Sequence, residues 1–147
     1  MIGEPILGFT GEYSFLSNFH MVDIEIEGQT YKSSEHYYMC QKTTDARWYN
    51  MILEAPSGAK AKKIGRNAPL RKDWIEKYKL QSMGKAIEVK FAIPDMQDRL
   101  LATGGRHIEE TNDWGDVFWG VCNGEGKNIL GKILMAYRTH YRASRYE

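Results

Sequence analysis

The most regular pattern in the chain lies in residues 128–141, which read NILGKILMAYRTHY. Apolar side chains recur there every three or four positions, as one face of a helix requires, at Ile129, Leu130, Ile133, Leu134, Tyr137 and Tyr141. Asn128 precedes them and belongs to the residue types that favour the N-cap position. The stretch therefore predicts a long C-terminal helix that packs one face on the core.

Two further helices are predicted before residue 70. Ser33 or Ser34 can cap a helix over about residues 35–53, which has a mixed face and should therefore be buried on several sides. Pro56 and Ser57 open a short lysine-rich helix, and Gly65 ends it.

Two more helices are predicted between residues 73 and 104. Asp73 and Glu76 have the residue types of a capping box. The helix that they begin should run to Pro94, because apolar residues recur at roughly helical spacing at Leu80, Met83, Ile87 and Phe91. Asp95 can cap the next short helix, which Gly104 and Gly105 stop.

A small amount of β-structure is expected as well. Ile24 and Ile26 alternate with acidic residues, and Gly28 leads into Thr30 and Tyr31, which predicts a hairpin. Residues 114–122 fit a loop or a strand. The whole chain, residues 1–147, is therefore expected to form a single compact α+β domain that is mainly helical and contains a small β-sheet.

Composition and charge exclude several classes of protein. A chain of 147 residues, 42% of them hydrophobic, has the usual size of one globular domain. It contains neither the run of about 20 apolar residues that spans a bilayer nor the pattern of a secretory leader, so we expect a cytoplasmic protein with no membrane contact. The net charge of +1 argues against broad nucleic-acid coating but leaves room for a local phosphate site.

Histidines and cysteines indicate neither a metal site nor a disulfide. No HExxH motif or paired spacing is formed by the four histidines, which are His20, His36, His107 and His140. Cys40 and Cys122 lie far apart and show no CxxC spacing, so we expect two free thiols.

A carboxylate and an amine share one predicted helix. Glu35 lies near its start, where the helix dipole favours an ionised carboxylate that could stabilise positive charge on a sugar. Lys42 lies seven residues further on, hence on almost the same face, and a lysine of lowered pKa can form a Schiff base with a ring-opened sugar. The plainer alternatives are an acid that only complements the dipole and a solvated surface lysine.

A second group of candidates contains tryptophans. Asp116 and Trp119 would meet on one face only if their segment turned helically, whereas an extended segment would separate them, and the sequence leaves this open. A carboxylate beside an indole suits a site that stacks an aromatic base, although tryptophans in small domains more often belong to the core. Trp74 presents the same choice.

Three places could hold a phosphate group. One is Ser17 with Asn18, and another is the basic cluster that contains Arg66, which is more often a solvated helix face; its lysines are Lys60, Lys62 and Lys63. The third is the set of backbone amides at the start of the last helix, around Gly124, Gly126 and Asn128.

Taken together, the motifs of the chain resemble those of the NADAR (NAD and ADP-ribose) superfamily, in the order that the family shows. They cover residues 9–138 and begin with Phe15-Leu16-Ser17-Asn18-Phe19, Ser34-Glu35-His36, Gln41-Lys42, Ala59-Lys60, Gly65-Arg66 and Asp73-Trp74. They continue with Lys90-Phe91, Leu100-Leu101-Ala102-Thr103-Gly104, Asp116-Val117-Phe118-Trp119-Gly120 and Asn128-Ile129-Leu130-Gly131-Lys132-Ile133-Leu134-Met135. Their joint occurrence is specific, whereas no single motif is.

The resemblance implies a YbiA-type N-glycosidase that uses no metal or other cofactor. It implies two substrate classes, namely phosphorylated ribosylamino-pyrimidine intermediates of riboflavin synthesis and ADP-ribosylated guanine in DNA, RNA or nucleotides. It also implies an active-site set of Glu35, Trp74, Asp116 and Trp119, with Lys42 as the Schiff-base candidate. Substrate-binding residues that match the motifs are Ser17, Asn18, Arg66, Gly120 and Asn128.

The sequence thus favours one hypothesis over two rivals. In the favoured hypothesis Glu35 or Asp116 stabilises the cationic sugar, while the other orients ribose hydroxyls or water. Trp74 and Trp119 would sandwich the base. The rivals are a non-catalytic module that binds ADP-ribose or a nucleotide and a structural interaction domain that binds no ligand.

Overall fold

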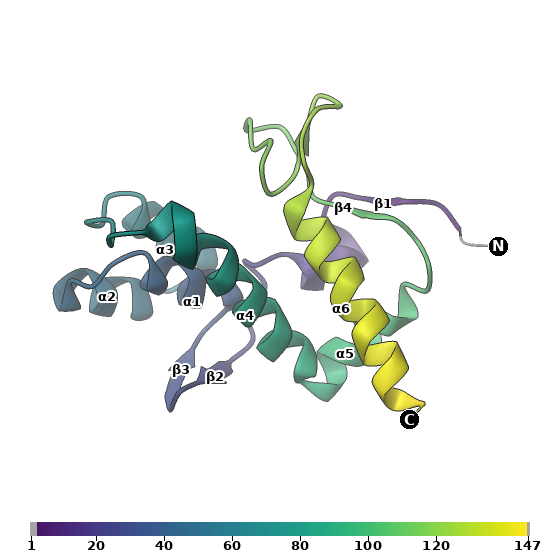
Figure 1. The fold of residues 1–147 in the computed structure, drawn as a ribbon, viewed down its shortest axis with the longest axis horizontal. Helices are drawn as coiled ribbons and strands as arrows, with labels where there is room; N and C mark the ends of the chain where they lie inside the picture. The colour runs from purple at the N-terminus through teal and green to yellow at the C-terminus, as the bar shows by residue number, and fades with distance from the viewer. Residues whose placement is uncertain (1–2, 147) are drawn as a thin grey trace. The chain divides into compact units, whose positions relative to one another are not determined.

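The computed structural model describes residues 3–146, which divide into two compact units. Unit 1 combines the N-terminal segment, as far as Ser17, with the segment from Phe91 onward, and unit 2 is Asn18–Lys90. The architecture is α+β and mainly helical, as predicted (Figure 1). The strands of the described residues form three separate two-stranded pairs, so the expected β-structure is small and also divided.

Unit 2 begins with the predicted hairpin, which is confirmed. Strands β2 (Ile24–Ile26) and β3 (Gln29–Tyr31) pair antiparallel, with Ile24 opposite Tyr31. Glu27 and Gly28 form the turn with φ values of 52° and 82°. Two successive positive φ angles are typical of the two-residue turns whose twist matches that of the flanking strands.

Helices α1 (Ser34–Gln41) and α2 (Ala46–Leu53) take the place of the single helix that we predicted over residues 35–53, so that prediction is wrong. The chain leaves α1 at Lys42, and Asp45 starts a new helix. Its Oδ1 accepts hydrogen bonds from the N–H groups of Arg47 (2.9 Å) and Trp48 (3.3 Å). Asp45 itself has extended backbone angles, which a continuous helix cannot contain.

Helix α3 (Gly58–Gly65) confirms the predicted lysine-rich helix, and it packs with α1 and α2 (Figure 1). Ser57 is its N-cap and accepts a hydrogen bond from the N–H of Lys60 (3.1 Å).

Cys40 is fully buried, and this burial raises the pKa of its thiol to about 12. Both cysteines are free thiols, as predicted, and Cys122 is half-buried.

The predicted capping box at Asp73 is wrong. Asp73 has a left-handed backbone (φ 62°, ψ 26°), and its side chain makes no capping hydrogen bond. A π-helix, Trp74–Tyr78, follows and leads into α4 (Lys79–Ala92). Met83 and Ile87 of α4 are buried as expected, but Leu80 is 52% exposed because the helix has only just begun there.

Unit 1 contains the remaining helices. A 3-10 helix, Gly11–Leu16 (η1), contacts α5 (Pro94–Ala102), and α5 in turn contacts α6 (Ile129–Arg145). Pro94 occupies the first turn of α5 and Ile93 is its N-cap residue, so the cap that we predicted at Asp95 is wrong. The long C-terminal helix is confirmed, and it buries Leu130 and Leu134.

Two parallel strand pairs lie beside these helices. Strand β1 (Ile6–Leu7) pairs with β4 (Ile108–Glu109), and β5 (Thr111–Asn112) pairs with β6 (Val121–Cys122). Helix α6 contacts β4. The contact explains Gly131 inside the helix, since a Cβ at this position would collide with the carbonyl oxygen of Ile108. Among residues 3–146, no helix is long and apolar enough to cross a membrane.

Candidate active site

The first turn of α1 is held in place by its neighbours in unit 2. Ser33 is the N-cap, and its Oγ accepts a hydrogen bond from the N–H of His36 (3.2 Å). The carbonyl oxygen of Asn18 accepts a hydrogen bond from the N–H of Glu35 (3.1 Å), and its Oδ1 accepts one from the Ser34 hydroxyl (2.8 Å). Asn18 therefore fixes the position of the Glu35 backbone.

His36 supports this turn from inside unit 2. Its side chain is fully buried, with Nε2 2.9 Å from the carbonyl oxygen of Ala55 and Nδ1 2.6 Å from the Ser33 hydroxyl. A carbonyl only accepts, so Nε2 carries the proton and Nδ1 accepts from Ser33. Burial lowers the pKa of His36, with a smaller opposite effect from the Ala55 hydrogen bond. The imidazole is thus an uncharged support.

Glu35 and Lys42 lie at the two ends of α1. Glu35 is in the first turn, and only 6% of its surface is exposed. The helix is capped by Ser33, directly before this turn. Lys42 is the C-cap residue, and its carbonyl oxygen accepts a hydrogen bond from the N–H of Arg71 (2.7 Å).

The surroundings of Lys42 lower the pKa of its amine below the ordinary value. Burial lowers the pKa of Lys42, and the negative charge of Glu35 opposes this effect. Three cations lower the pKa further, namely Lys79, Arg66 and Lys62. Arg66 is the exposed C-cap residue of α3. The structure thus brings Glu35 and Arg66 within electrostatic reach of Lys42.

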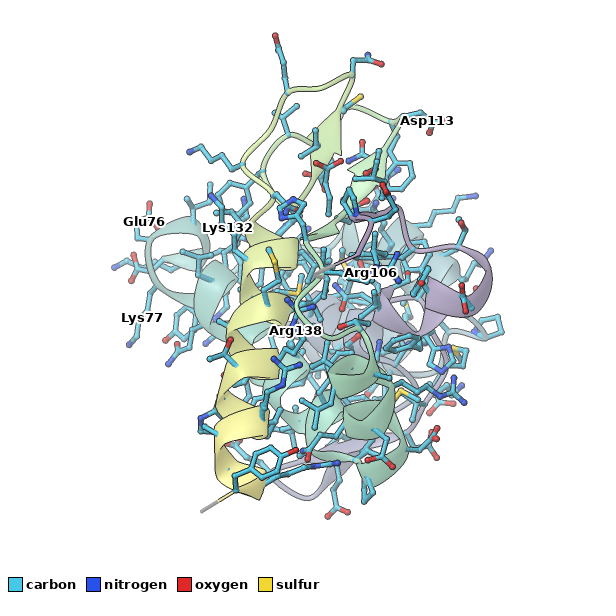
Figure 2. The ribbon with its side chains drawn as sticks, turned by 90° about the vertical axis from the view of Figure 1, so that its right-hand side faces the viewer. Glu76, Lys77, Arg106, Asp113, Lys132 and Arg138 are labelled. Carbon is cyan, nitrogen blue, oxygen red and sulfur yellow. The ribbon has the colours of Figure 1, made fainter. Side chains whose placement is uncertain are left out.

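Trp74 opens the π-helix and lies against α1. Its ring packs on Tyr38, with the ring centroids 5.4 Å apart and the planes at 59°. Only 5% of Trp74 is exposed, whereas Glu76 and Lys77 of the same π-helix point outward (Figure 2). Single π-helical turns are often found at functional sites. The contact with Tyr38 anchors this turn on the helix that carries Glu35.

In unit 1, Asp116 organises the loop that precedes β6. Its Oδ1 accepts hydrogen bonds from the N–H groups of Phe118 (3.1 Å) and Trp119 (2.9 Å). Its own N–H donates to Asn112 Oδ1 (3.1 Å), and its carbonyl oxygen accepts from Asn112 Nδ2 (2.9 Å). The segment therefore turns, and the choice that the sequence left open is resolved: Asp116 and Trp119 are brought together.

The same loop is clamped to the start of α6 by backbone hydrogen bonds. The N–H groups of residues 127–130 donate to the carbonyl oxygens of residues 117–120, at 2.8 to 3.2 Å. These N–H groups would otherwise lack partners at a helix start. They are not available for a phosphate group, which removes the Asn128 part of our third candidate for phosphate binding. Trp119 also packs edge to face on Phe118, with the ring centroids 4.8 Å apart.

Gly120 and Asn128 make this close approach possible. A Cβ on Gly120 would collide with the carbonyl oxygen of Glu110. Asn128 has a left-handed backbone (φ 52°) and does not cap α6 with its side chain, contrary to our expectation. Instead its Oδ1 accepts from the N–H of Glu110 (3.0 Å), and its Nδ2 donates to the carbonyl oxygen of Ile108 (2.9 Å). Asn128 therefore ties α6 to β4.

Sequence reasoning missed two positioning residues. Asn112 holds both backbone groups of Asp116, and the spacing of four between two Asx residues was the only signal for it. Arg71 was missed as well, although it clamps the end of α1 through the carbonyl oxygens of Lys42 and Gln41. Ser17 is the C-cap of η1, and its N–H donates to the carbonyl oxygen of Ser14 (3.0 Å).

Metal ligands are not grouped anywhere in the described part of the chain. No three His, Cys, Asp or Glu side chains of residues 3–146 are arranged so that they could hold a metal ion.

The comparison with known families identifies the chain. A family model described as the NADAR domain matches residues 8–142, which include the segments around Glu35 and Asp116. The chain belongs to the NADAR domain family. Among its relatives, N-glycosidase YbiA of Shigella boydii is 39% identical over 143 residues, which cover 92% of this NADAR chain and 88% of that protein.

Two further relatives extend the comparison. A riboflavin biosynthesis protein of Vibrio vulnificus is 35% identical over 130 residues, which cover 86% of this NADAR chain and 35% of that larger protein. The NMR structure of Escherichia coli YbiA superposes with a TM-score of 0.85 at 34% identity, covering 100% of this chain and 90% of that one. The resemblance and the mainly helical α+β fold that the sequence predicted are both confirmed.

Proposed function

We propose that this NADAR chain is an N-glycosidase, a hydrolase that cleaves the bond between a base nitrogen and the anomeric carbon of a phosphorylated ribose, and that residues 1–147 work as one NADAR-type domain. Family membership and the N-glycosidase name of its relatives support the reaction class. The observation that carries the proposal is Glu35, a nearly buried carboxylate on a rigidly held helix start, within electrostatic reach of Lys42.

The carboxylates would divide the work of bond cleavage. Positive charge develops on the sugar as the base leaves, and a buried carboxylate stabilises it better than an exposed one because the local dielectric constant is lower. We assign this role to Glu35, which is 6% exposed. Asp116 uses Oδ1 to hold its own loop, so its Oδ2 would orient a ribose hydroxyl or the attacking water.

Lys42 would take part as a nucleophile. Its neutral amine would attack the anomeric carbon as the bond to the base breaks, and the base would leave with a proton. Opening of the sugar ring would then give a Schiff base, which water would hydrolyse to release the sugar aldehyde and restore the amine. The lowered pKa of Lys42 supports this role, because more of the amine is neutral at a given pH.

The tryptophans and basic groups would bind the substrate. Trp119 and Trp74 would contact the base. Arg66, with the neighbouring lysines, would bind the phosphate, with Ser17 and Asn18 at its border. Gly120 and Asn128 would act through the loop that they position.

Two substrate classes are proposed for the site. One is a phosphorylated ribosylamino-pyrimidine of riboflavin synthesis, and the name of the Vibrio vulnificus relative supports it. The other is ADP-ribosylated guanine in DNA, RNA or a nucleotide. A net charge of +1 suits a single extruded nucleotide, which needs few contacts with the rest of the nucleic acid.

The direct test offers both substrates to the protein and measures the released base by mass spectrometry. We expect release from at least one substrate, and a loss of at least about a hundredfold in rate for Glu35→Gln, as for removal of one transition-state-stabilising group. The matched control is Glu54→Gln, which makes the same change at an exposed residue of unit 2. Substrate binding without base release by the unaltered protein would instead support the non-catalytic rival.

Borohydride reduction tests the role of Lys42. Reduction during turnover should leave a covalent sugar adduct on Lys42 of the wild type and none on Lys42→Arg. Lys85→Arg serves as the control because Lys85 is exposed on α4 of the same unit. If the wild type hydrolyses substrate but no adduct forms, the Schiff base is excluded, whereas hydrolysis through Glu35 is not.

A further inference from the structure

Unit 1 contains a cavity of about 440 Å³ that none of the candidate site residues lines. Its walls come from η1, from the C-terminal half of α5 and from the segment that follows α5. The residues used below are Glu12, Tyr13, Phe15, Arg99, Thr103 and Arg106. A volume of this size is typical of sites that bind small molecules.

Arg106 is held in a defined orientation at this cavity. Its Nε donates to the carbonyl oxygen of Glu4 (2.5 Å), and its Nη1 donates to the Tyr13 hydroxyl (2.5 Å). The guanidinium also lies 5.2 Å from the centre of the Tyr13 ring. A guanidinium has five N–H donors in a planar fork, so donors remain for a ligand after these two hydrogen bonds.

Arg99 adds a second positive charge to the cavity. Its guanidinium lies 6.0 Å from the centre of the Phe15 ring. Its ion pair with Asp95, at 3.3 Å, is half-exposed and therefore weak, so it competes little with a bound anion. Glu12 is the one carboxylate among the residues that line the cavity, and it suits a ligand that also carries hydroxyl groups.

A third guanidinium lies directly behind the wall. Arg138 of α6 donates from Nη1 to Thr103 Oγ1 (2.9 Å), and Thr103 lines the cavity. Arg138 is only 6% exposed, and within residues 3–146 its buried Nε has no hydrogen-bond partner. Burial of a charged group without a counter-ion is costly, so an anion nearby would offset this cost. Figure 2 labels Arg138 on α6 and Arg106 on the segment after α5.

We propose that this cavity binds a small phosphate ester that carries hydroxyl groups, such as a sugar phosphate. Arg106 and Arg99 would bind the phosphate, and Glu12 would accept a hydrogen bond from a hydroxyl group. Two guanidinium charges match the charge of about −2 on a phosphate monoester at neutral pH. This site is additional to the one proposed above, and it does not depend on the glycosidase activity.

The test is a titration of the full chain with ribose 5-phosphate, followed through the NMR signals of the arginine Nε–H groups. Signals of Arg106 and Arg99, assigned by their loss in Arg106→Lys and Arg99→Lys, should shift with ribose 5-phosphate. They should not shift with ribose. Because the readout is at these arginines, binding at the glycosidase site leaves it unchanged.

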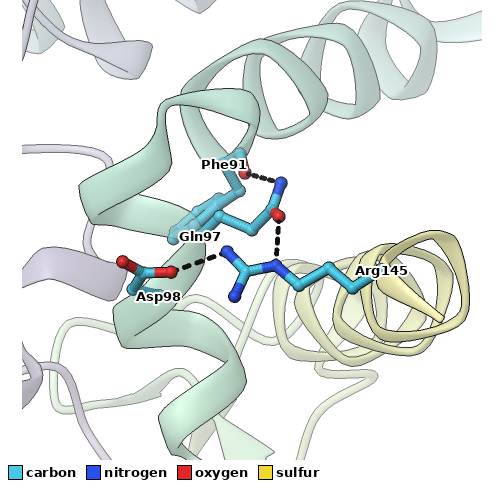
Figure 3. A network of polar contacts seen from close by, with 4 residues as sticks. All are labelled: Phe91, Gln97, Asp98 and Arg145. Atoms are coloured by element: carbon cyan, nitrogen blue, oxygen red, sulfur yellow. Dashed lines mark hydrogen bonds and ion pairs between the residues drawn. The ribbon is translucent and has the colours of Figure 1, made fainter.

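The control is Arg145→Lys, at an arginine of the same unit that does not line the cavity. Arg145 donates to Gln97 Oε1 (2.9 Å) and pairs with Asp98 (2.6 Å), while Gln97 also donates to the carbonyl oxygen of Phe91 (Figure 3). Arg106→Lys should weaken the binding that the Arg99 signal reports by at least about tenfold, because lysine lacks the planar fork. Arg145→Lys should leave that binding unchanged.

Two results would overturn the proposal. One is that millimolar ribose 5-phosphate leaves the Arg106 and Arg99 signals of the wild type in place. The other is that inorganic phosphate and ribose 5-phosphate bind equally weakly, and that Arg106→Lys affects neither. Thermal melting of each variant checks that it is folded, and Arg99→Gln provides a second variant that breaks none of the contacts of Arg106.

Discussion

The backbone N–H groups at the starts of α1 and α6 find their hydrogen-bond partners in opposite ways. At α1 a side chain, Ser33, caps the helix. Asn18 holds the first turn from outside, and His36 within α1 bonds to the carbonyl oxygen of Ala55. At α6 the backbone of the preceding loop satisfies the free N–H groups, and Asp116 holds that loop in shape. Each region carries one candidate carboxylate, and that of Asp116 accepts the hydrogen bonds that hold its loop in shape.

This difference affects how each region responds to a substitution. The backbone of Glu35 is positioned by Asn18, and Ser33 caps its helix. Asp116 positions other residues, so removal of its side chain removes a support as well as a reactive group. The following predictions test this contrast, from the largest expected effect on stability to the smallest.

Asp116→Ala should lower the free energy of unfolding by about 3 kcal/mol, because two hydrogen bonds to a charged acceptor are lost in a half-buried loop. Asp116→Asn keeps an Oδ1 acceptor and should cost less than about 1 kcal/mol, while base release is still lost. Denaturant unfolding and product analysis of both variants check this. Equal unfolding midpoints for the two variants would contradict the support role of the carboxylate.

His36 should make the α1 region sensitive to acid. Burial lowers its pKa in the folded chain below the ordinary value of 6.5, so the unfolded chain binds the proton more readily. Stability is therefore lost as the pH falls below 6.5, by up to about 2 kcal/mol between pH 7 and pH 5. His36→Gln, which cannot titrate, should lose less over this range.

The measurement for His36 is denaturant unfolding at both pH values. A wild type and a variant with the same pH dependence would show that other groups cause the acid sensitivity. Asp116→Asn provides the comparison from the other region, and it should keep the pH dependence of the wild type.

Asp45→Ala measures how much an ordinary helix cap contributes to the free energy of unfolding. Asp45 is exposed and caps α2 through two backbone N–H groups, so its removal should cost about 1 kcal/mol. Thermal unfolding measures it, with Asp45→Asn as the conservative control. A cost as large as that of Asp116→Ala would remove the distinction between an ordinary cap and the loop support.

The sequence was informative wherever local periodicity determined the structure. The register of α6, the β2–β3 hairpin and the cap at Ser57 were all predicted, because each depends on residues a few positions apart. The break between α1 and α2 was missed, because no Gly or Pro interrupts residues 35–53 and only the Asp45 cap marks the new helix. The parallel strand pairs were missed because each has two residues per strand and joins distant segments.

The candidate site was predicted to a similar extent. The position of Glu35 in a first helical turn followed from the two candidate caps, Ser33 and Ser34, of which the structure uses Ser33. The geometry at Asp116 did not, because it depends on Asn112 and on backbone contacts with α6 that no side-chain pattern records. Asn128 was taken for a cap because its residue type fits, but its side chain has partners in β4 and directly after it.

The two cysteines differ in reactivity, so a thiol reagent can label one of them selectively. A thiol reacts as the thiolate, and burial raises the pKa of Cys40 to about 12, so almost none of it is reactive at neutral pH. Cys122 is half-buried, and its backbone closes the tight turn with Glu125 (2.8 Å) at the far end of the Asp116 loop. A maleimide dye would therefore attach at Cys122, next to the loop, and its fluorescence would report movements of that loop without an engineered residue.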